Sequence, residues 1–207
     1  MSGTYILGAN GHGRVVLSVL RSNGGDALGF YDDAPELSEA IISGLSVLGR
    51  LEDFGRLSGA EAIIGIGDCK VRRMVASKFR DILWAVAVHA HSWVDPLCTV
   101  ALGSVVCAGA VVQVGAQIGA HCIINTGATV DHDCRIGNFV HICPGVHLGG
   151  NVTVGNGSWL GIGSQVIQGI TIGKNVMVAA GATVVRDISD NAVVMGTPAR
   201  IVRHQSC

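Results

Sequence analysis

The 207-residue sequence predicts a mixed fold, with a small Rossmann-like α/β domain over residues 1–92 and a parallel β-helix over residues 93–207. Three observations predict it. Short apolar strands alternate with helical stretches in the first part, the second part repeats with a period of six, and glycine is frequent where that repeat would turn. No uninterrupted apolar run approaches about 18 residues, so we expect no membrane-spanning helix and no membrane partner.

The order of its elements predicts a small parallel sheet in the first domain. Short apolar stretches that read as strands are 4–7, 27–31, 62–67 and 85–88. Helical spacing of apolar residues is found over 14–20, before Asn23-Gly24-Gly25, and over 70–80, with Arg72 and Arg73 in the first turn. Strands that alternate with helices form parallel sheets.

A glycine-rich loop over residues 8–13 links the first strand to the first helix. Small residues at a helix N-terminus let a phosphate approach the backbone amides, and the helix dipole favours an anion there. The glycines read GxxGxG rather than GxGxxG, and a tight turn without a ligand is the alternative. The candidate nucleotide-binding residues of this loop are Asn10, Gly11, His12 and Gly13.

Two further groups of candidate substrate residues follow predicted strands. Asp32 and Asp33 come about 20 residues after the loop, where a carboxylate can accept hydrogen bonds from a ribose or a base. The alternative for this pair is a solvated turn before Pro35. Gly67 and Asp68 end the third strand and complete the predicted substrate site.

The β-helix is predicted by sixteen consecutive six-residue blocks from Val94 to Ser189, each of which begins with an aliphatic residue. The fifth position of every block is small or β-branched. We expect each block to form one short strand and one corner, three blocks to close a triangular coil, and stacked coils to bury a column of aliphatic side chains. Glycine supplies the corner conformations that a β-carbon disfavours.

Composition excludes several classes of partner. Charged residues make up 14% of the chain and the net charge is −1, whereas nucleic-acid binders carry a basic surplus. Residues 1–4 lead directly into a strand without a signal-peptide core. Seven cysteines without framework spacing are typical of reduced thiols, although metal or redox use is the alternative. A cytoplasmic protein is therefore expected.

One histidine of the repeat stands out because it lies between two acids. The histidines that interrupt the repeat are His121, His132, His141 and His147, and we expect His121 and His147 to be surface or inter-coil residues. His132 is flanked by Asp131 and Asp133. A neighbouring carboxylate can hold an imidazole in one tautomer, as a general base requires, but the sequence leaves open which acid does so.

The hexapeptide pattern resembles the left-handed parallel β-helix of hexapeptide acyltransferases, and the segment Gly196-Thr197-Pro198-Ala199-Arg200 is typical of them. The whole chain resembles the nucleotide-sugar N-acetyltransferases and sialic-acid O-acetyltransferases with a Rossmann-like N-terminal domain. The supporting stretches are YILGANGHG, GFYDD, IIGIGDCKVRR and TGATVDHDCRIGNFVHICPGVHLGGNVTVGNGSWLGIGSQV. Ser92 and Asp68 depart from the proline and asparagine that many relatives carry there.

The resemblance implies roles for several residues. It implies that His132 is the general base and that Asp133 orients it, while His141 contacts acetyl-CoA near its thioester. Acyl transfer also needs a donor for the developing oxyanion. The backbone amides of Gly149 and Gly150 are candidates, and the family places Gly150 against the thioester oxygen. The remaining implied coenzyme contacts are Ile162 and Ala180.

The expected activity is acetyl-CoA-dependent N-acetylation of a nucleotide-linked amino sugar, such as a perosamine-like 4-amino-4,6-dideoxyhexose on UDP or GDP. O-acetylation of sialic acid or a related hydroxyl is the alternative. The resemblance also implies a homotrimer with sites between subunits and a role in surface polysaccharide, O-antigen or glycoprotein glycan synthesis. A zinc enzyme is disfavoured because His141 and His147 lack the HxxxxH spacing of hexapeptide carbonic anhydrases, so no metal is expected. A non-catalytic scaffold is disfavoured by the acid-flanked His132.

Overall fold

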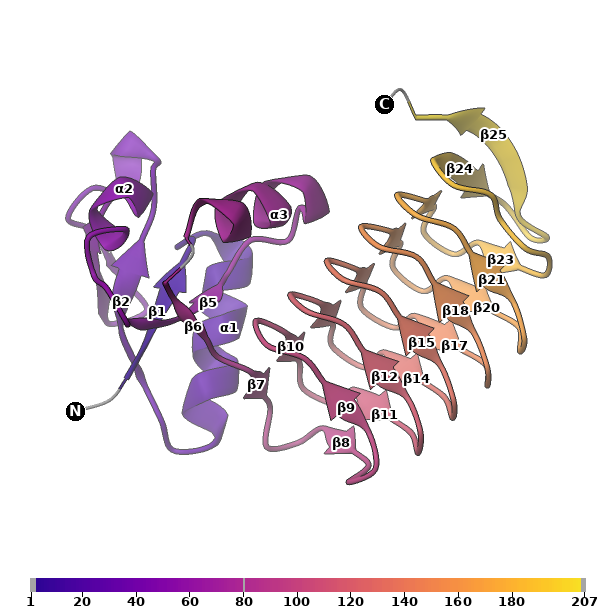
Figure 1. Ribbon diagram of the computed structural model, residues 1–207, viewed down its shortest axis with the longest axis horizontal. Coiled ribbons are helices and arrows are strands. Elements are labelled where there is room, and N and C mark those ends of the chain that lie inside the picture. Colours follow the sequence, from indigo (N-terminus) through magenta and orange to yellow (C-terminus); the bar gives the residue numbers. More distant parts are fainter. Residues whose placement is uncertain (1–2, 80, 206–207) are drawn as a thin grey trace.

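The computed structural model describes residues 3–79 and 81–205 and shows the two expected parts side by side (Figure 1). The N-terminal part is a six-stranded sheet in the order β3-β4-β2-β1-β5-β6. Its elements are β1 (Thr4–Leu7), α1 (Gly11–Ser22), β2 (Ala27–Tyr31), η1 (Pro35–Leu37), β3 (Ile41–Ile42), β4 (Leu45–Gly49), α2 (Leu51–Phe54), β5 (Glu61–Ile64), α3 (Cys69–Lys78) and β6 (Leu83–Trp84). The mixed fold class is therefore confirmed.

The N-terminal domain differs from the expectation at one edge of its sheet and at the start of its first helix. β1 pairs in parallel with β2 and β5, but β3 and β4 form an antiparallel hairpin that the sequence analysis did not predict. Ser43 and Gly44 make its turn with positive φ angles of 52° and 81°. Helix α1 begins at Gly11, three residues before the expected start, so the second half of the expected loop is its first turn. Arg80, the expected end of α3, lies outside the described residues, as do Met1 and Ser2.

The β-helix consists of two-residue strands separated by corners. These strands are β7 (Ala87–Val88), β8 (Trp93–Val94), β9 (Thr99–Val100), β10 (Val105–Val106), β11 (Val111–Val112), β12 (Gln117–Ile118), β13 (Ile123–Ile124), β14 (Thr129–Val130), β15 (Arg135–Ile136), β16 (His141–Ile142), β17 (His147–Leu148), β18 (Thr153–Val154), β19 (Trp159–Leu160), β20 (Gln165–Val166), β21 (Thr171–Ile172), β22 (Met177–Val178) and β23 (Thr183–Val184). A hairpin of β24 (Ala192–Met195) and β25 (Arg200–His204) closes the end.

The register confirms that three blocks make one coil. Ile124 pairs with Ile142, and Ile142 pairs with Leu160, so partners are 18 residues apart. These aliphatic residues point inward and are fully buried. The three sides of the prism are an eight-stranded face (β7, β10, β13, β16, β19, β22, β24, β25), a six-stranded face (β8, β11, β14, β17, β20, β23) and a five-stranded face (β9, β12, β15, β18, β21).

The strand expected over residues 85–88 of the first domain is corrected by the structure. The last strand of the N-terminal sheet is Leu83–Trp84, and Ala87–Val88 pairs with Val105–Val106 as the first strand of the β-helix. The physical reason is that Val88 lies six residues before Val94 and fills the same inward position. The repeat thus starts one block earlier than the sixteen blocks indicated.

One buried cation links the N-terminal domain to the eight-stranded face, beside apolar contacts that include Val105 of β10. The Arg72 side chain, from α3, is 1% exposed. Its guanidinium donates to the carbonyl oxygens of Ile66 and Gly67 in its own domain, at 3.0 and 2.9 Å. It also donates to those of His121 and Phe139 in the β-helix, at 2.8 and 3.1 Å. Arg72 therefore joins the two domains through backbone acceptors.

We expect Arg72→Met to destabilise the protein by roughly 3–5 kcal/mol, because it leaves several buried carbonyl groups without a donor. Thermal unfolding should show a fall in midpoint of roughly 10 °C. Arg73→Met is the matched control, because Arg73 is exposed and its hydrogen bond to Asn175 is long, at 3.5 Å. Equal losses in the two variants would contradict this role for Arg72.

Candidate active site

His132 lies at the corner between the six-stranded and five-stranded faces, in the turn that joins β14 to β15. Its Nδ1 is 2.9 Å from Oδ2 of Asp133. Oδ1 of Asp131 instead accepts the backbone N–H of His132 at 2.8 Å. Asp133 thus contacts the ring, while Asp131 stabilises the turn. The sequence had left this choice open.

The environment of His132 favours its protonated form. The hydrogen bond to Asp133 raises the pKa of the imidazole above its ordinary value, and the nearby charge of Asp131 adds to this. Because a carboxylate can only accept, Nδ1 carries the hydrogen and Nε2 keeps the lone pair. Nε2 is therefore the basic atom of this group.

Gly150 lies directly against the His132 ring, one coil further along. A β-carbon added at residue 150 would come within 2.4 Å of His132 Nε2, so only glycine leaves room for the imidazole. The N–H of Gly149 donates to the Val166 carbonyl at 2.9 Å. The N–H of Gly150 has no hydrogen-bond partner among the described residues. Of the two candidate oxyanion donors, only Gly150 has a free N–H.

His141 occupies a different side of the molecule, the outer surface of the eight-stranded face, where it is 8% exposed. Its Nδ1 is 3.0 Å from the Gly67 carbonyl oxygen, and its Nε2 is 3.0 Å from Nδ2 of Asn125. A carbonyl only accepts, so Nδ1 donates and Nε2 accepts from the amide. Burial lowers the His141 pKa to about 3, with smaller contributions from Arg72 and His12. This imidazole is neutral.

His12 faces His141 from the first turn of α1, with 6.2 Å between the ring centroids. Burial, and then the Arg72 charge, lower its pKa to about 4. Its Nε2 is buried without a hydrogen-bond partner among the described residues. Two neutral imidazoles thus lie at the junction of the domains.

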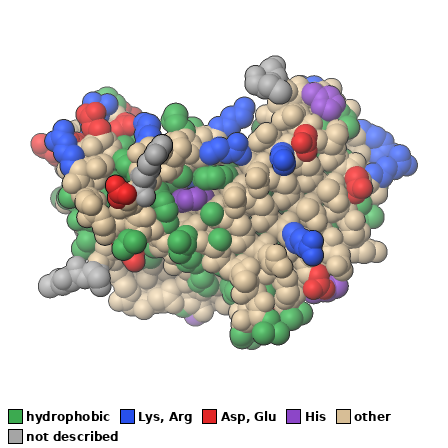
Figure 2. Space-filling view, viewed as in Figure 1, with side chains coloured by type: hydrophobic (Ala, Val, Ile, Leu, Met, Phe, Trp, Pro, Cys, Tyr) green, Lys and Arg blue, Asp and Glu red, His purple; other side chains and the backbone are tan. Residues whose placement is uncertain are grey.

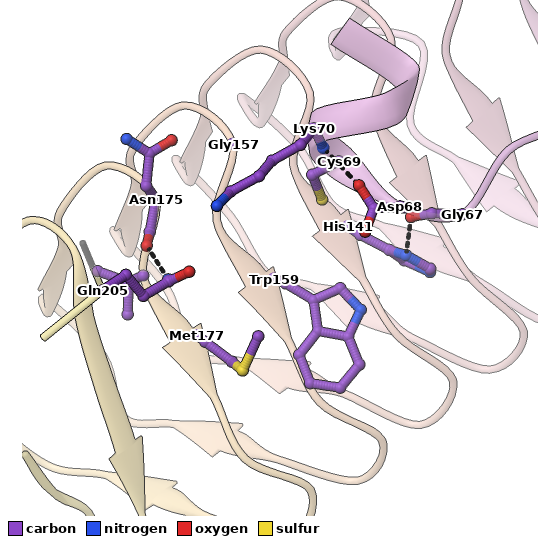
Figure 3. Close-up of a pocket in the computed structure, with 11 residues that line it drawn as sticks. Gly67, Asp68, Cys69, Lys70, His141, Gly157, Trp159, Asn175, Met177 and Gln205 are labelled. Atoms are coloured by element: carbon purple, nitrogen blue, oxygen red, sulfur yellow. Dashed lines mark hydrogen bonds between the residues drawn. The ribbon is translucent and has the colours of Figure 1, made fainter. Parts of the chain in front are cut away.

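Two cavities meet at this junction. The loop cavity, of about 320 Å³, lies beside the glycine-rich turn. It is lined by Gly8, Asn10, His12, Asp32, Asp33, Leu51, Gly65, Ile66, Gly67, Val71, Met74, Val75 and Lys78. The interdomain cavity, of about 420 Å³, lies between the start of α3 and the eight-stranded face (Figure 3). It is lined by Gly67, Asp68, Cys69, Lys70, His141, Gly157, Trp159, Asn175, Val176, Met177 and Gln205. Gly67 belongs to both.

Most of the predicted substrate residues line these cavities. Asn10, His12, Asp32, Asp33 and Gly67 line the loop cavity, and Gly67 and Asp68 line the interdomain cavity. Gly11 and Gly13 line neither. A β-carbon at Gly13 would come within 2.0 Å of the Gly8 carbonyl oxygen, so this glycine lets α1 pack closely on β1.

The predicted carboxylates also stabilise the backbone around them. Asp32 accepts from the N–H groups of Ala9 and Ala34 at 2.7 and 2.9 Å. Asp33 accepts from the N–H of Leu51 at 3.0 Å. Asp68 is the N-cap of α3 and accepts from Lys70 and Val71. These carboxylates therefore shape the cavities in addition to facing them.

The implied coenzyme contacts other than His141 and Gly150 lie at a further corner. Ile162 and Ala180 occupy equivalent positions on successive coils, between the eight-stranded and six-stranded faces, and both are exposed. His132 lies at the corner between the six-stranded and five-stranded faces, which is opposite the eight-stranded face, and it lines neither cavity. Within one chain, His132 and Gly150 form one group of predicted residues, and the cavity residues with Ile162 and Ala180 form another. The two groups lie on different sides of the molecule.

The other two histidines of the repeat lie between coils, as expected. The His121 ring stacks on Phe139, with centroids 5.0 Å apart, and meets the edge of Trp84. His147 is 2.9 Å from Oγ1 of Thr129 on the preceding coil. Burial and the Arg72 charge lower the His121 pKa to about 4.

The sequence analysis missed much of the interdomain cavity. Lys70, Trp159, Asn175, Met177 and Gln205 all line it without having been predicted. The 18-residue register offers a signal for two of them. Trp159 and Met177 follow His141 by one and two coils in the outward position, so they share its surface.

The junction is open to ligands, and its surroundings are mainly apolar. Figure 2 shows hydrophobic side chains gathered where the two parts meet, with Lys and Arg side chains at the rim.

Within residues 3–79 and 81–205, no three His, Cys, Asp or Glu side chains are grouped as a metal site would require. In the same part of the chain, every helix is too short or too polar to cross a membrane.

Comparison with known proteins identifies both parts. A family model described as the PglD N-terminal domain matches residues 4–79, and one described as bacterial transferase hexapeptide, with six repeats, matches residues 151–186. The uncharacterized protein L142 of Acanthamoeba polyphaga mimivirus is 29% identical over 115 residues, or 56% of this chain. This chain spans 23% of the length of that curated relative.

Two solved structures are similar over nearly the full length. The acetyltransferase domain of PglB from Neisseria gonorrhoeae FA1090 is 36% identical, with a TM-score of 0.91 over 98% of this chain and 100% of that one. PerB from Caulobacter crescentus, in complex with CoA and GDP-perosamine, is 36% identical, with a TM-score of 0.90 over 96% of each chain. The protein therefore belongs to the hexapeptide-repeat sugar acetyltransferases that carry a PglD-type N-terminal domain, the family that its sequence resembles.

Proposed function

We propose that this protein transfers the acetyl group of acetyl-CoA to the amine of a nucleotide-linked amino sugar, such as a 4-amino-4,6-dideoxyhexose. One observation carries the proposal: the Asp133-held imidazole of His132 lies against Gly150, whose N–H is free. The acetyl-CoA complex of the PglB domain and the GDP-perosamine complex of PerB support the choice of co-substrate and acceptor.

In the proposed reaction the sugar amine attacks the thioester carbon, so that a C–N bond forms and the C–S bond breaks. His132 Nε2 accepts the proton that the amine loses, and the Asp133 carboxylate stabilises the resulting imidazolium. The free N–H of Gly150 donates to the thioester oxygen as it gains charge. The proton then passes to the departing thiolate, which leaves as the thiol of CoA.

The loop cavity is the proposed nucleotide site. It lies at the carboxyl ends of β1, β2 and β5, where parallel sheets of this kind bind nucleotides. Asp32 and Asp33 keep acceptor capacity beyond their backbone hydrogen bonds, which a ribose or a base could use. Lys78 adds a cation to the cavity wall. Whether the nucleotide is UDP or GDP is decided by calorimetric titration with each.

The proposed active site is composite. His132 and Gly150 lie at one corner of the prism, whereas His141, Ile162 and Ala180 lie on or beside the face that carries the cavities. We propose a homotrimer in which His132 of one subunit meets the cavities and coenzyme contacts of its neighbour. We propose a role in O-antigen or another surface polysaccharide on the family resemblance, and a cytoplasmic location on the expected reduced cysteines.

We expect His132→Ala to lower kcat by about 10²-fold or more, because the proton acceptor is lost. The assay is thiol release from acetyl-CoA with GDP- and UDP-linked 4-amino-4,6-dideoxyhexoses, with sialic acid included to test O-acetylation. Light scattering and thermal unfolding should match the wild type, since His132 is exposed. Wild-type turnover in the variant would remove His132 from the mechanism.

We expect Asp133→Asn to move the acidic limb of the kcat profile to lower pH. In the wild type, Asp133 raises the His132 pKa, so the basic form is lost as pH falls through a value above the ordinary one of about 6.5. The amide removes that effect, and it also lowers the maximal rate because the tautomer is no longer fixed. Asp131→Asn should shift the limb less. An unchanged limb in Asp133→Asn would argue against general-base catalysis by His132.

We expect subunit mixing to restore activity between two inactive variants. His132→Ala subunits keep an intact nucleotide cavity, and Asp32→Ala subunits keep an intact base. If the site is shared, about one quarter of the sites in randomly mixed trimers should combine the two intact halves. Assay after co-refolding of equal amounts measures this fraction. Activity no higher than that of the separate variants would show that each chain works alone.

A further inference from the structure

We propose that the interdomain cavity is the sugar subsite, with Trp159 as the platform on which the hexose ring rests. This inference rests on the proposed function. It adds Trp159, Lys70 and Gln205 to Gly67 and Asp68, the two predicted substrate residues that line this cavity.

The platform exists because the N-terminal domain covers only part of the eight-stranded face. Outward side chains on this face follow one another every 18 residues. Those of Val105 and Ile123 are 1% exposed beneath the N-terminal domain. Trp159 is half-buried and Met177 is 36% exposed, beyond the edge of that domain. The N-terminal domain therefore covers this face only as far as His141. Beyond it, the indole of Trp159 and the thioether of Met177 form the apolar floor of the cavity.

Polar groups line the cavity from two sides, Lys70 from α3 and Gln205 from the C-terminal segment. Lys70 extends over the cavity from the first turn of α3 toward Gly157 and Asn175 (Figure 3). None of the ion pairs among the described residues involves its ammonium group. Gln205 donates to the Asn175 carbonyl at 2.6 Å, and its own side-chain oxygen remains available as an acceptor. An apolar floor with a few polar groups at the rim is typical of sites for small molecules.

This combination fits a hexose. A pyranose ring presents C–H groups on its faces and hydroxyl groups around its edge. The indole of Trp159 offers a large rigid apolar surface to the ring face. Lys70 supplies donors and Gln205 an acceptor to the same cavity, for the edge hydroxyls. The volume of about 420 Å³ falls in the usual range of small-molecule pockets, roughly 300–1,000 Å³.

The position of the cavity favours the sugar over the coenzyme arm. Gly67 lines both cavities, so a ligand with its nucleotide in the loop cavity reaches Trp159 past Gly67 and His141. The other lining residues come from α3, the eight-stranded face, its corner with the five-stranded face, and the C-terminal segment. Of the implied coenzyme contacts on this side of the prism, Ile162 and Ala180 lie at the opposite edge of that face and are absent from the lining. His141, the contact implied for the thioester end, lines the cavity, so the sugar would lie beside the reacting end of the coenzyme.

The test compares Trp159→Ala, Trp159→Phe and the control Leu102→Ala, which removes an exposed side chain away from both cavities. The probes are GDP- and UDP-linked 4-amino-4,6-dideoxyhexoses, the free nucleoside diphosphates, and acetyl-CoA. We expect Trp159→Ala to weaken nucleotide-sugar binding about tenfold or more, with less than about twofold change for the free nucleotide and for the KM of acetyl-CoA. Trp159→Phe should recover most of the loss, and Leu102→Ala should resemble the wild type.

Three results would overturn the sugar subsite. A rise in the KM of acetyl-CoA alone would assign the cavity to the coenzyme. Equal weakening of free nucleotide and nucleotide sugar would make Trp159 a support of the loop cavity, and unchanged binding would leave no subsite. Calorimetric binding is measured separately from turnover. Trp159-dependent binding without acetyl transfer in the wild type would therefore refute the proposed function and retain the subsite.

Discussion

The stacking of inward aliphatic side chains every 18 residues is the constraint on which the rest of this structure depends. Ile124, Ile142 and Leu160 align because each coil must bury its apolar column against the next. That alignment also fixes the outward neighbours, so His141, Trp159 and Met177 share one surface. Residues at corners are aligned in the same way, which brings Gly150 against the His132 ring. A packing rule of the core thereby places the groups that face solvent and ligands.

The second organising contact is the guanidinium of Arg72, buried among backbone carbonyls of both domains. It has no carboxylate partner among the described residues, so its charge acts on the neighbouring imidazoles. Together with burial it keeps His12 and His141 neutral. It also shares the Gly67 carbonyl with His141, and so the contact that joins the domains orients a side chain of the cavity.

His132 and His141 show how the environment separates two residues of the same type. The exposed ring of His132 donates to a carboxylate, which raises its pKa. The buried ring of His141 donates to a carbonyl near a fixed cation, and its pKa falls to about 3. The first environment suits proton transfer, whereas the second holds a neutral hydrogen-bonding group in one tautomer. The environment of His132 comes from its neighbour Asp133, which is held at the same corner. The environment of His141 comes from residues distant in sequence, Gly67 and Arg72.

The sequence by itself determined the coil period, the inward column, the α/β order of the first domain and the position of His132 between two acids, because these depend on local spacing and on adjacent residues. It misplaced residues 85–88, since only pairing with Val105–Val106 shows that Ala87–Val88 belongs to the β-helix. Tertiary structure alone decided that Asp133 rather than Asp131 contacts the ring, that Arg72 joins the domains and that Trp159 lines a cavity. Each of these depends on where the N-terminal domain or a corner lies in space, and no local pattern encodes that placement.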